Sequence, residues 1–121
     1  MSYDLFFWRE TAGANLDPER IFEELEDMMT MPGIVPISLE TVNVAFSQLF
    51  SECKDCGGTI EWEGEGSYFQ VGFTFLDEKT ITLGTIACGY DLAKNRAAME
   101  RLTQAITTLG CRLYDPQQVE S

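Results

Sequence analysis

The sequence contains no histidine, so it lacks the side chain that most often acts as a general base or as a metal ligand. It also has no glycine-rich phosphate loop ahead of a helix, no GxSxG nucleophile motif and no Asp-x-Asp calcium loop. No stretch approaches the roughly 20 apolar residues that a membrane span needs. We therefore expect a protein without enzymatic activity and without a transmembrane segment.

Basic residues are also few, since eight Lys and Arg stand against 20 Asp and Glu and the net charge is -12. The negative charge is concentrated in the first part of the chain. Residues 1–78 hold 16 acidic and three basic residues, whereas residues 79–121 hold four acidic and five basic ones. Such a charge repels nucleic acid and anionic membranes and attracts a basic protein partner. An acidic composition that serves only solubility is the alternative interpretation.

The four cysteines are candidates for a metal site or for free thiols. Residues 1–10 do not have the basic segment and apolar run of a secretory signal, so we expect free thiols in a reducing, cytoplasmic compartment. Cys53 and Cys56 have the spacing of one zinc knuckle, but Cys88 and Cys111 are 23 positions apart and would have to converge on that knuckle. We favour a glycine-rich loop and expect no cofactor.

Period-two alternation of apolar residues predicts three antiparallel strands between Gly58 and Cys88. In the third of these strands Ile81 and Leu83 are predicted to point inward. The alternation then changes phase, which makes Gly84 the candidate for a β-bulge. Further strands are predicted at residues 3–8, which are apolar on both faces as in a sheet interior, and at residues 111–114.

Three amphipathic helices are predicted from apolar residues at helical spacing. Asp17 caps an acidic helix that runs to Thr30, Ser38 caps a second that ends near Glu52, and Asp91 caps a third that runs to Leu109. The order is β-α-α-β-β-β-α-β in a single α+β domain over residues 1–121. We expect a two-layer sandwich with a mixed, mostly antiparallel sheet and the helices on one face.

The polar face of the predicted meander is the candidate binding surface. It carries Glu61, Glu63, Glu65, Tyr68 and Gln70, together with Thr74 and Thr82, and the first helix adds Glu23, Glu24 and Asp27. Tyr68 and Trp8 would act as aromatic anchors, with the carboxylates setting orientation and association rate. The alternative is an ordinary solvated sheet face.

The two ends of the chain carry a family resemblance. The segments SYDLFFW (residues 2–8) and RLYDPQ (residues 112–117) resemble the paired ends of small acidic bacterial immunity proteins encoded beside toxins of contact-dependent or type VI secretion systems. The resemblance implies a cytoplasmic protein that binds one toxin domain tightly and blocks its active site or its substrate access. It carries over no binding residue, because the matching ends would be structural strands lying side by side.

Two other classes of function stay open from the sequence. One is a small non-catalytic interaction module of another pathway. The other is a zinc-binding or ligand-binding domain, for which a deep pocket lined by Cys53, Cys56 or Glu61 would be expected. Within the immunity interpretation, the acidic charge favours a basic toxin such as a nuclease domain.

Overall fold

The computed structural model describes residues 3–27, 30–51, 53–55, 59–64, 66–89 and 92–115. In chain order its elements are β1 (Tyr3–Trp8), α1 (Pro18–Asp27), β2 (Ile37–Ser38), α2 (Leu39–Leu49), β3 (Lys54–Asp55), β4 (Ile60–Gly64), β5 (Ser67–Asp77), β6 (Thr80–Cys88), the 3-10 turn η1 (Leu92–Lys94), α3 (Arg96–Thr108) and β7 (Arg112–Tyr114). The predicted α+β class is confirmed, and the order of elements matches apart from the two-residue strands β2 and β3. No helix among the described residues is long and apolar enough to cross a membrane.

The sheet has the strand order β3-β4-β5-β6-β1-β7. The two-residue strand β2 is additional to this order and pairs with β6. β1 lies between β6 and β7 and is antiparallel to both, so the first and last strands are neighbours, as the resemblance implied. β6 and β7 consequently run parallel to each other, with α3 in the connection between them. The central place of β1 explains why it is apolar on both faces.

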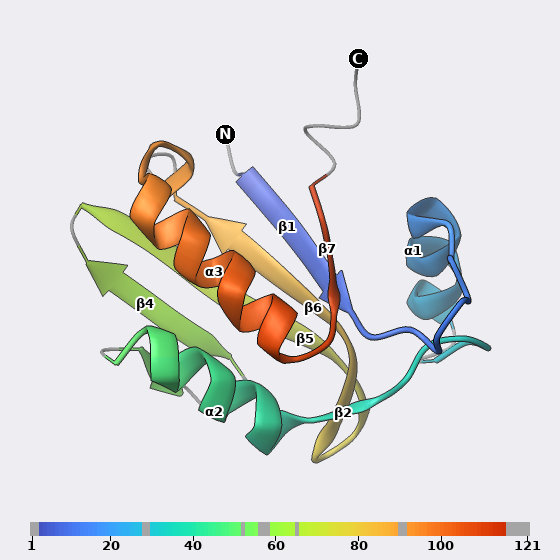
Figure 1. Ribbon diagram of the computed structural model, residues 1–121. Coiled ribbons are helices and arrows are strands. Elements are labelled where there is room, and N and C mark those ends of the chain that lie inside the picture. The colour runs from blue at the N-terminus through green and yellow to red at the C-terminus, as the bar shows by residue number, and fades with distance from the viewer. Residues whose placement is uncertain are drawn as a thin grey trace.

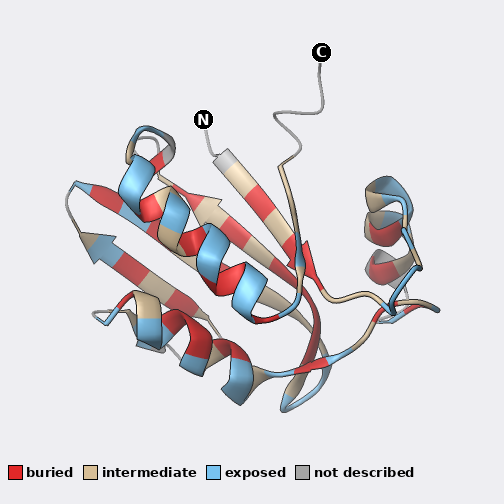
Figure 2. Cartoon of the chain, in the orientation of Figure 1, coloured by how far each residue is buried: buried red, intermediate tan, exposed pale blue. Residues whose placement is uncertain are grey.

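Two helices, α2 and α3, cover one face of this sheet (Figure 1). Their inward stripes are buried, whereas their outer sides are largely exposed (Figure 2). Leu5 and Phe7 of β1 belong to the core beneath these helices, together with Phe46 of α2 and Leu102 of α3. This core joins the two helices to the sheet through burial of apolar surface.

Helix α1 lies apart from the other two, beyond the β1–β7 side of the sheet (Figure 1). Its buried residues Ile21 and Leu25 pack in a second cluster with Trp8 and Leu83. Because side chains alternate along a strand, Trp8 points to the face opposite Phe7. The expectation that all helices share one face is therefore wrong for α1, since the second apolar face of β1 needs a cover of its own.

The bulge in β6 lies at Thr82, two residues before the position predicted for it, and a second irregularity between Phe75 and Asp77 affects β5. Thr74 pairs with Leu83 and Phe75 pairs with Ile81, which leaves Thr82 as the extra residue. Thr82 is 0% exposed, so the prediction of an exposed Thr82 is wrong. Leu83 is buried as predicted, but it packs in the cluster under α1 and not in the core under α2 and α3. Gly84 serves another purpose: a Cβ atom there would lie 2.1 Å from the Phe7 ring.

The helix ends follow the predicted chemistry in part. The Asp17 carboxylate accepts a hydrogen bond from the amide two residues further on, which confirms it as the cap of α1. Ser38 occupies the cap position of α2 but makes no side-chain cap hydrogen bond. Asn95 caps α3 through the amide of Ala98, while the predicted cap Asp91 lies outside the described residues.

Candidate functional site

Four predicted residues share one face of the hairpin formed by β4 and β5. Glu61 pairs with Gln70 and Glu63 pairs with Tyr68 across the two strands. The intervening Trp62 is buried in the core under α2 and α3, so these four side chains point to the opposite face. We call this set, Glu61, Glu63, Tyr68 and Gln70, the β4–β5 face.

The aromatic ring of the β4–β5 face is held by its neighbours. The Tyr68 hydroxyl donates its single proton to Oε1 of Glu61 at 3.3 Å, and Oε1 of Gln70 is the alternative acceptor at 3.5 Å. The residue is nevertheless 37% exposed. An exposed ring that is already oriented loses little conformational freedom on binding, which suits it as an anchor.

Carboxylates extend from this face across the sheet. The cross-strand row runs from Lys54 through Glu61, Gln70 and Ala87 to Asp4. Because these residues lie in register, their side chains emerge on the same face. The row is acidic at both its Glu61 and Asp4 positions, and Lys54 of β3 is the basic residue in it.

The acidic residues predicted on the first helix form a separate region. α1 packs near β1 and β6, whereas β4 lies near the opposite edge of the sheet. Glu23 is exposed, and Glu24 forms an ion pair with Arg20 at 3.7 Å. Asp27 ends α1, and Glu65 lies outside the described residues. The structure therefore does not bring the two predicted sets together.

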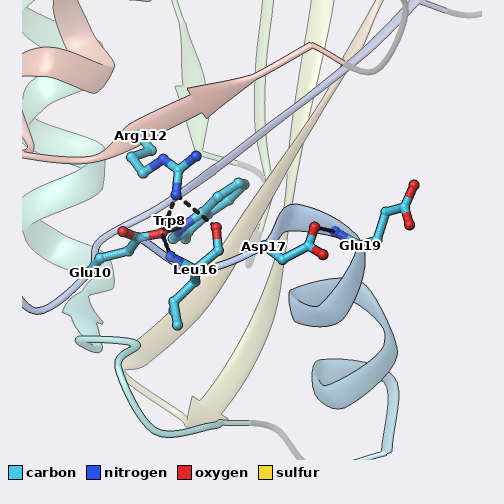
Figure 3. Close-up of polar contacts among 6 residues, drawn as sticks. All are labelled: Trp8, Glu10, Leu16, Asp17, Glu19 and Arg112. Carbon is cyan, nitrogen blue, oxygen red and sulfur yellow. Dashed lines mark hydrogen bonds and ion pairs between the residues drawn. The ribbon is translucent and has the colours of Figure 1, made fainter. Parts of the chain in front are cut away.

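Trp8 is not an anchor, because it is 0% exposed and forms part of a polar cluster (Figure 3). Its indole Nε1 donates to Oε1 of Glu10 at 2.8 Å, and Nη1 of Arg112 donates to the same oxygen at 2.5 Å. Arg112 also donates to the Leu16 carbonyl at 2.9 Å, and its guanidinium lies 5.2 Å from the Trp8 ring centre. This cluster ties the loop before α1 to the last strand. Sequence reasoning missed it, because Glu10 and Arg112 are 102 positions apart.

Replacing Arg112 tests this cluster. Arg112→Met should lower the free energy of unfolding by about 2 kcal/mol, because the Glu10 carboxylate, whose side chain is only 10% exposed, loses its ionic partner. Urea unfolding followed by circular dichroism measures this change. Arg20→Met removes the exposed ion pair on α1 and should change stability by less than about 0.5 kcal/mol. Equal effects of the two substitutions would contradict a structural role for Arg112.

Among the described residues, Cys53, Cys88 and Cys111 do not form a group of metal ligands. Cys53 is half-buried, with its Sγ 3.8 Å from Oγ of Ser47, and Cys56 lies outside the described residues. Burial raises the pKa of Cys88 to about 12, with the charges of Asp4 and Asp115 adding to the shift. Burial also raises the pKa of Cys111 to about 12, against a lowering by nearby Arg9. In the described part of the chain, no three potential ligands of the Cys, Asp or Glu type lie together.

The raised thiol pKa values predict a loss of stability in alkali. Between pH 9 and pH 12 the unfolded chain has lost thiol protons that the folded chain retains at Cys88 and Cys111, so the free energy of unfolding falls as pH rises. Urea midpoints at pH 8 and pH 10.5 measure this fall. Cys88→Ala should reduce it, whereas an unchanged fall in that variant would contradict the burial of this thiol.

A surface depression of about 340 Å³ lies where α2 begins beside the β5–β6 turn. It is lined by Ser38, Leu39, Glu40, Asn43, Glu78 and Lys79. The amide of Leu39 at its rim is already bonded to the Lys79 carbonyl at 2.8 Å. Of the residues expected for a ligand pocket, the described ones, Cys53 and Glu61, do not line this depression.

Comparison of the chain with protein-family models, with curated proteins and with solved structures gave no match.

Proposed function

We propose that this chain is a bacterial immunity protein, which binds a cognate toxin domain in the cytoplasm and neutralises it by occluding the active site. The observation that carries the proposal is the β4–β5 face. It combines an oriented, exposed tyrosine with the carboxylates of Glu61 and Glu63, and α2 and α3 pack on the other side of the sheet.

Two further observations support this proposal. The net charge of -12 attracts a basic partner over long range and speeds its association. The paired ends of the chain, which resemble those of immunity proteins, form adjacent strands. An aromatic anchor ringed by orienting charges is the arrangement that tight protein interfaces use.

Growth protection tests the proposal. The protein encoded by the adjacent gene is expressed in a bacterial host, alone or together with this chain. We expect growth arrest by the toxin domain alone, normal growth on co-expression, and co-purification of the two proteins in equal amounts. Continued growth arrest with no co-purifying protein would overturn the proposed function.

A further inference from the structure

The middle of the sheet carries a patch of small and polar residues on the face opposite α2 and α3. Phe69, Val71 and Ile86 belong to the core under these helices, so the residues that alternate with them along β5 and β6 point to the other face. We call four of these half-buried residues the β5–β6 floor: Gln70, Gly72, Thr85 and Ala87. Gln70 pairs with Ala87, and Gly72 pairs with Thr85. The floor adjoins the β4–β5 face, with which it shares Gln70.

The side chains of the floor leave room above it. A Cβ atom built at Gly72 would meet no other described residue within 4 Å, its chain neighbours apart, and Ala87 adds only a methyl group. Phe22 of α1 packs on Phe6 and Tyr114, with ring centres at 4.6 and 5.7 Å. Phe6 lies on β1, the strand next to β6. These aromatic contacts of α1 therefore delimit the floor along its β1 side.

Carboxylates flank the floor on both sides. Glu61 of β4 pairs with Gln70, and Asp4 of β1 pairs with Ala87, so the two acidic residues lie in one row across the sheet. Three strand spacings separate them, which is about 14 Å. An α-helix with its side chains is about 10–12 Å wide, so a helix that followed the floor would lie between the two carboxylates. Lysine or arginine side chains on the two flanks of that helix would complement them.

The backbone of the sheet favours a helix over an extended segment at this place. β5 pairs with β4 and β6, and β6 pairs with β5 and β1, so the main-chain groups at Gln70 and Ala87 are used within the sheet. An extended segment laid on this face would leave its own backbone groups without partners, whereas a helix satisfies them internally. The floor therefore suits an amphipathic helix with small or apolar residues beneath and basic residues on its flanks.

This chain does not itself supply such a helix. All eight Lys and Arg residues lie in the described ranges, so the residues outside those ranges bring no basic side chain to the floor. In a second copy, α2 has no basic residue and α1 has only Arg20. Of the two arginines of α3, Arg101 donates to the Leu49 carbonyl. None of the three helices offers basic residues on two flanks, so the charges favour a separate partner.

We propose that the β5–β6 floor seats a basic amphipathic helix of the toxin partner. This inference rests on the proposed function for the identity of the partner. The small side chains of the floor let the helix approach the sheet closely, and Phe6 and Phe22 offer apolar contact area at its side. The carboxylates of Glu61 and Asp4 orient its flanks. Because Tyr68 precedes Gln70 on the same face of β5, the helix also reaches the aromatic anchor of the β4–β5 face.

A model helix tests the floor without the toxin. The probe is a peptide of about 18 residues, or five helical turns, built from alanine, leucine and lysine with blocked ends. A hydrocarbon staple holds it helical, and it is titrated into the full isotopically labelled chain. We expect saturable shifts of backbone amide resonances centred on Gly72, Thr85 and Ala87. An unstapled peptide of the same charge with D-residues at its centre cannot form the helix, and it should bind at least tenfold more weakly.

Bulky substitutions provide the matched variants. Gly72→Trp raises the floor where there is room for a Cβ atom, and it should weaken binding of the peptide and of the toxin domain at least tenfold. Ala87→Arg places a positive charge in the row between Glu61 and Asp4, and it should weaken both in the same way. Val44→Trp adds the same bulk to an exposed position of α2 and should alter both affinities less than twofold. Thermal unfolding checks that each variant is folded.

The possible results separate the two proposals. Absence of saturable binding, equal binding of the disrupted peptide, shifts centred on α2 and α3, or self-association of the chain through the floor would each overturn the inference. If Gly72→Trp and Ala87→Arg bind the toxin domain as the wild type does, the floor inference falls and the proposed function stands. If the helical peptide binds the floor while no toxin is neutralised, the proposed function falls and the helix site stands.

Discussion

Gly84→Ala should destabilise the protein by about 3 kcal/mol or more and lower its Tm by at least about 10 °C. A Cβ atom at this position would lie 2.1, 2.2 and 2.7 Å from three atoms of the Phe7 ring. Phe7 is 0% exposed and packs against Phe46, so the ring has no free space to move into. Thermal unfolding of the purified variant measures the effect.

Gly72→Ala is the matched control for this substitution. Gly72 lies on the neighbouring strand β5, and a Cβ atom there meets nothing within 4 Å. Its replacement should leave stability unchanged or raise it by about 0.5 kcal/mol, because alanine costs less backbone entropy than glycine in a strand. In the Gly84→Ala background, Phe7→Leu should recover part of the loss. A Gly84→Ala variant with the Tm of the wild type would contradict the contact between β1 and β6.

Tyr68→Ala should weaken binding of the proposed toxin partner at least 30-fold, which corresponds to about 2 kcal/mol. The ring is exposed and its hydroxyl donates to Glu61, so its loss removes contact area that is already oriented before binding. Tyr68→Phe keeps the ring and should weaken binding less than tenfold. Titration calorimetry with the purified toxin domain measures all three affinities.

Val44→Ala provides the control for loss of exposed apolar surface. Val44 is 50% exposed on α2, on the other side of the sheet from the β4–β5 face. We expect its replacement to change affinity less than twofold. A larger effect at Val44 than at Tyr68 would place the interface on the helices and contradict the role given to the β4–β5 face.

Local patterns account for the parts of the fold that could be predicted. Alternation along β4 and β5 places Trp62 inward and Tyr68 outward whatever the tertiary arrangement. Likewise, apolar residues on both faces of β1 place it inside the sheet, and a carboxylate before Pro18 marks the start of α1. Each of these signals is contained within about ten residues of sequence.

Long-range contacts account for what could not be predicted. The pattern of its own strand predicts a bulge at Gly84, but the Phe7 ring from β1 requires the glycine and the extra residue is Thr82. No local sequence pattern links Glu10 to Arg112, because the two residues come together only where β7 pairs with β1. The acidic residues of α1 lie apart from the β4–β5 face for the same reason. Helical periodicity identifies the acidic side of α1, but it does not identify the strands against which the helix packs.

The most direct measurement is the binding kinetics of the purified chain with the domain encoded beside it, recorded at 50 and 500 mM NaCl so that both the association rate and the affinity are obtained. We expect a one-to-one complex of nanomolar affinity whose association rate falls at least tenfold at the higher salt, because a net charge of -12 steers a basic partner. No complex at micromolar concentrations, or an association rate independent of salt, would contradict an immunity protein that works through its acidic surface.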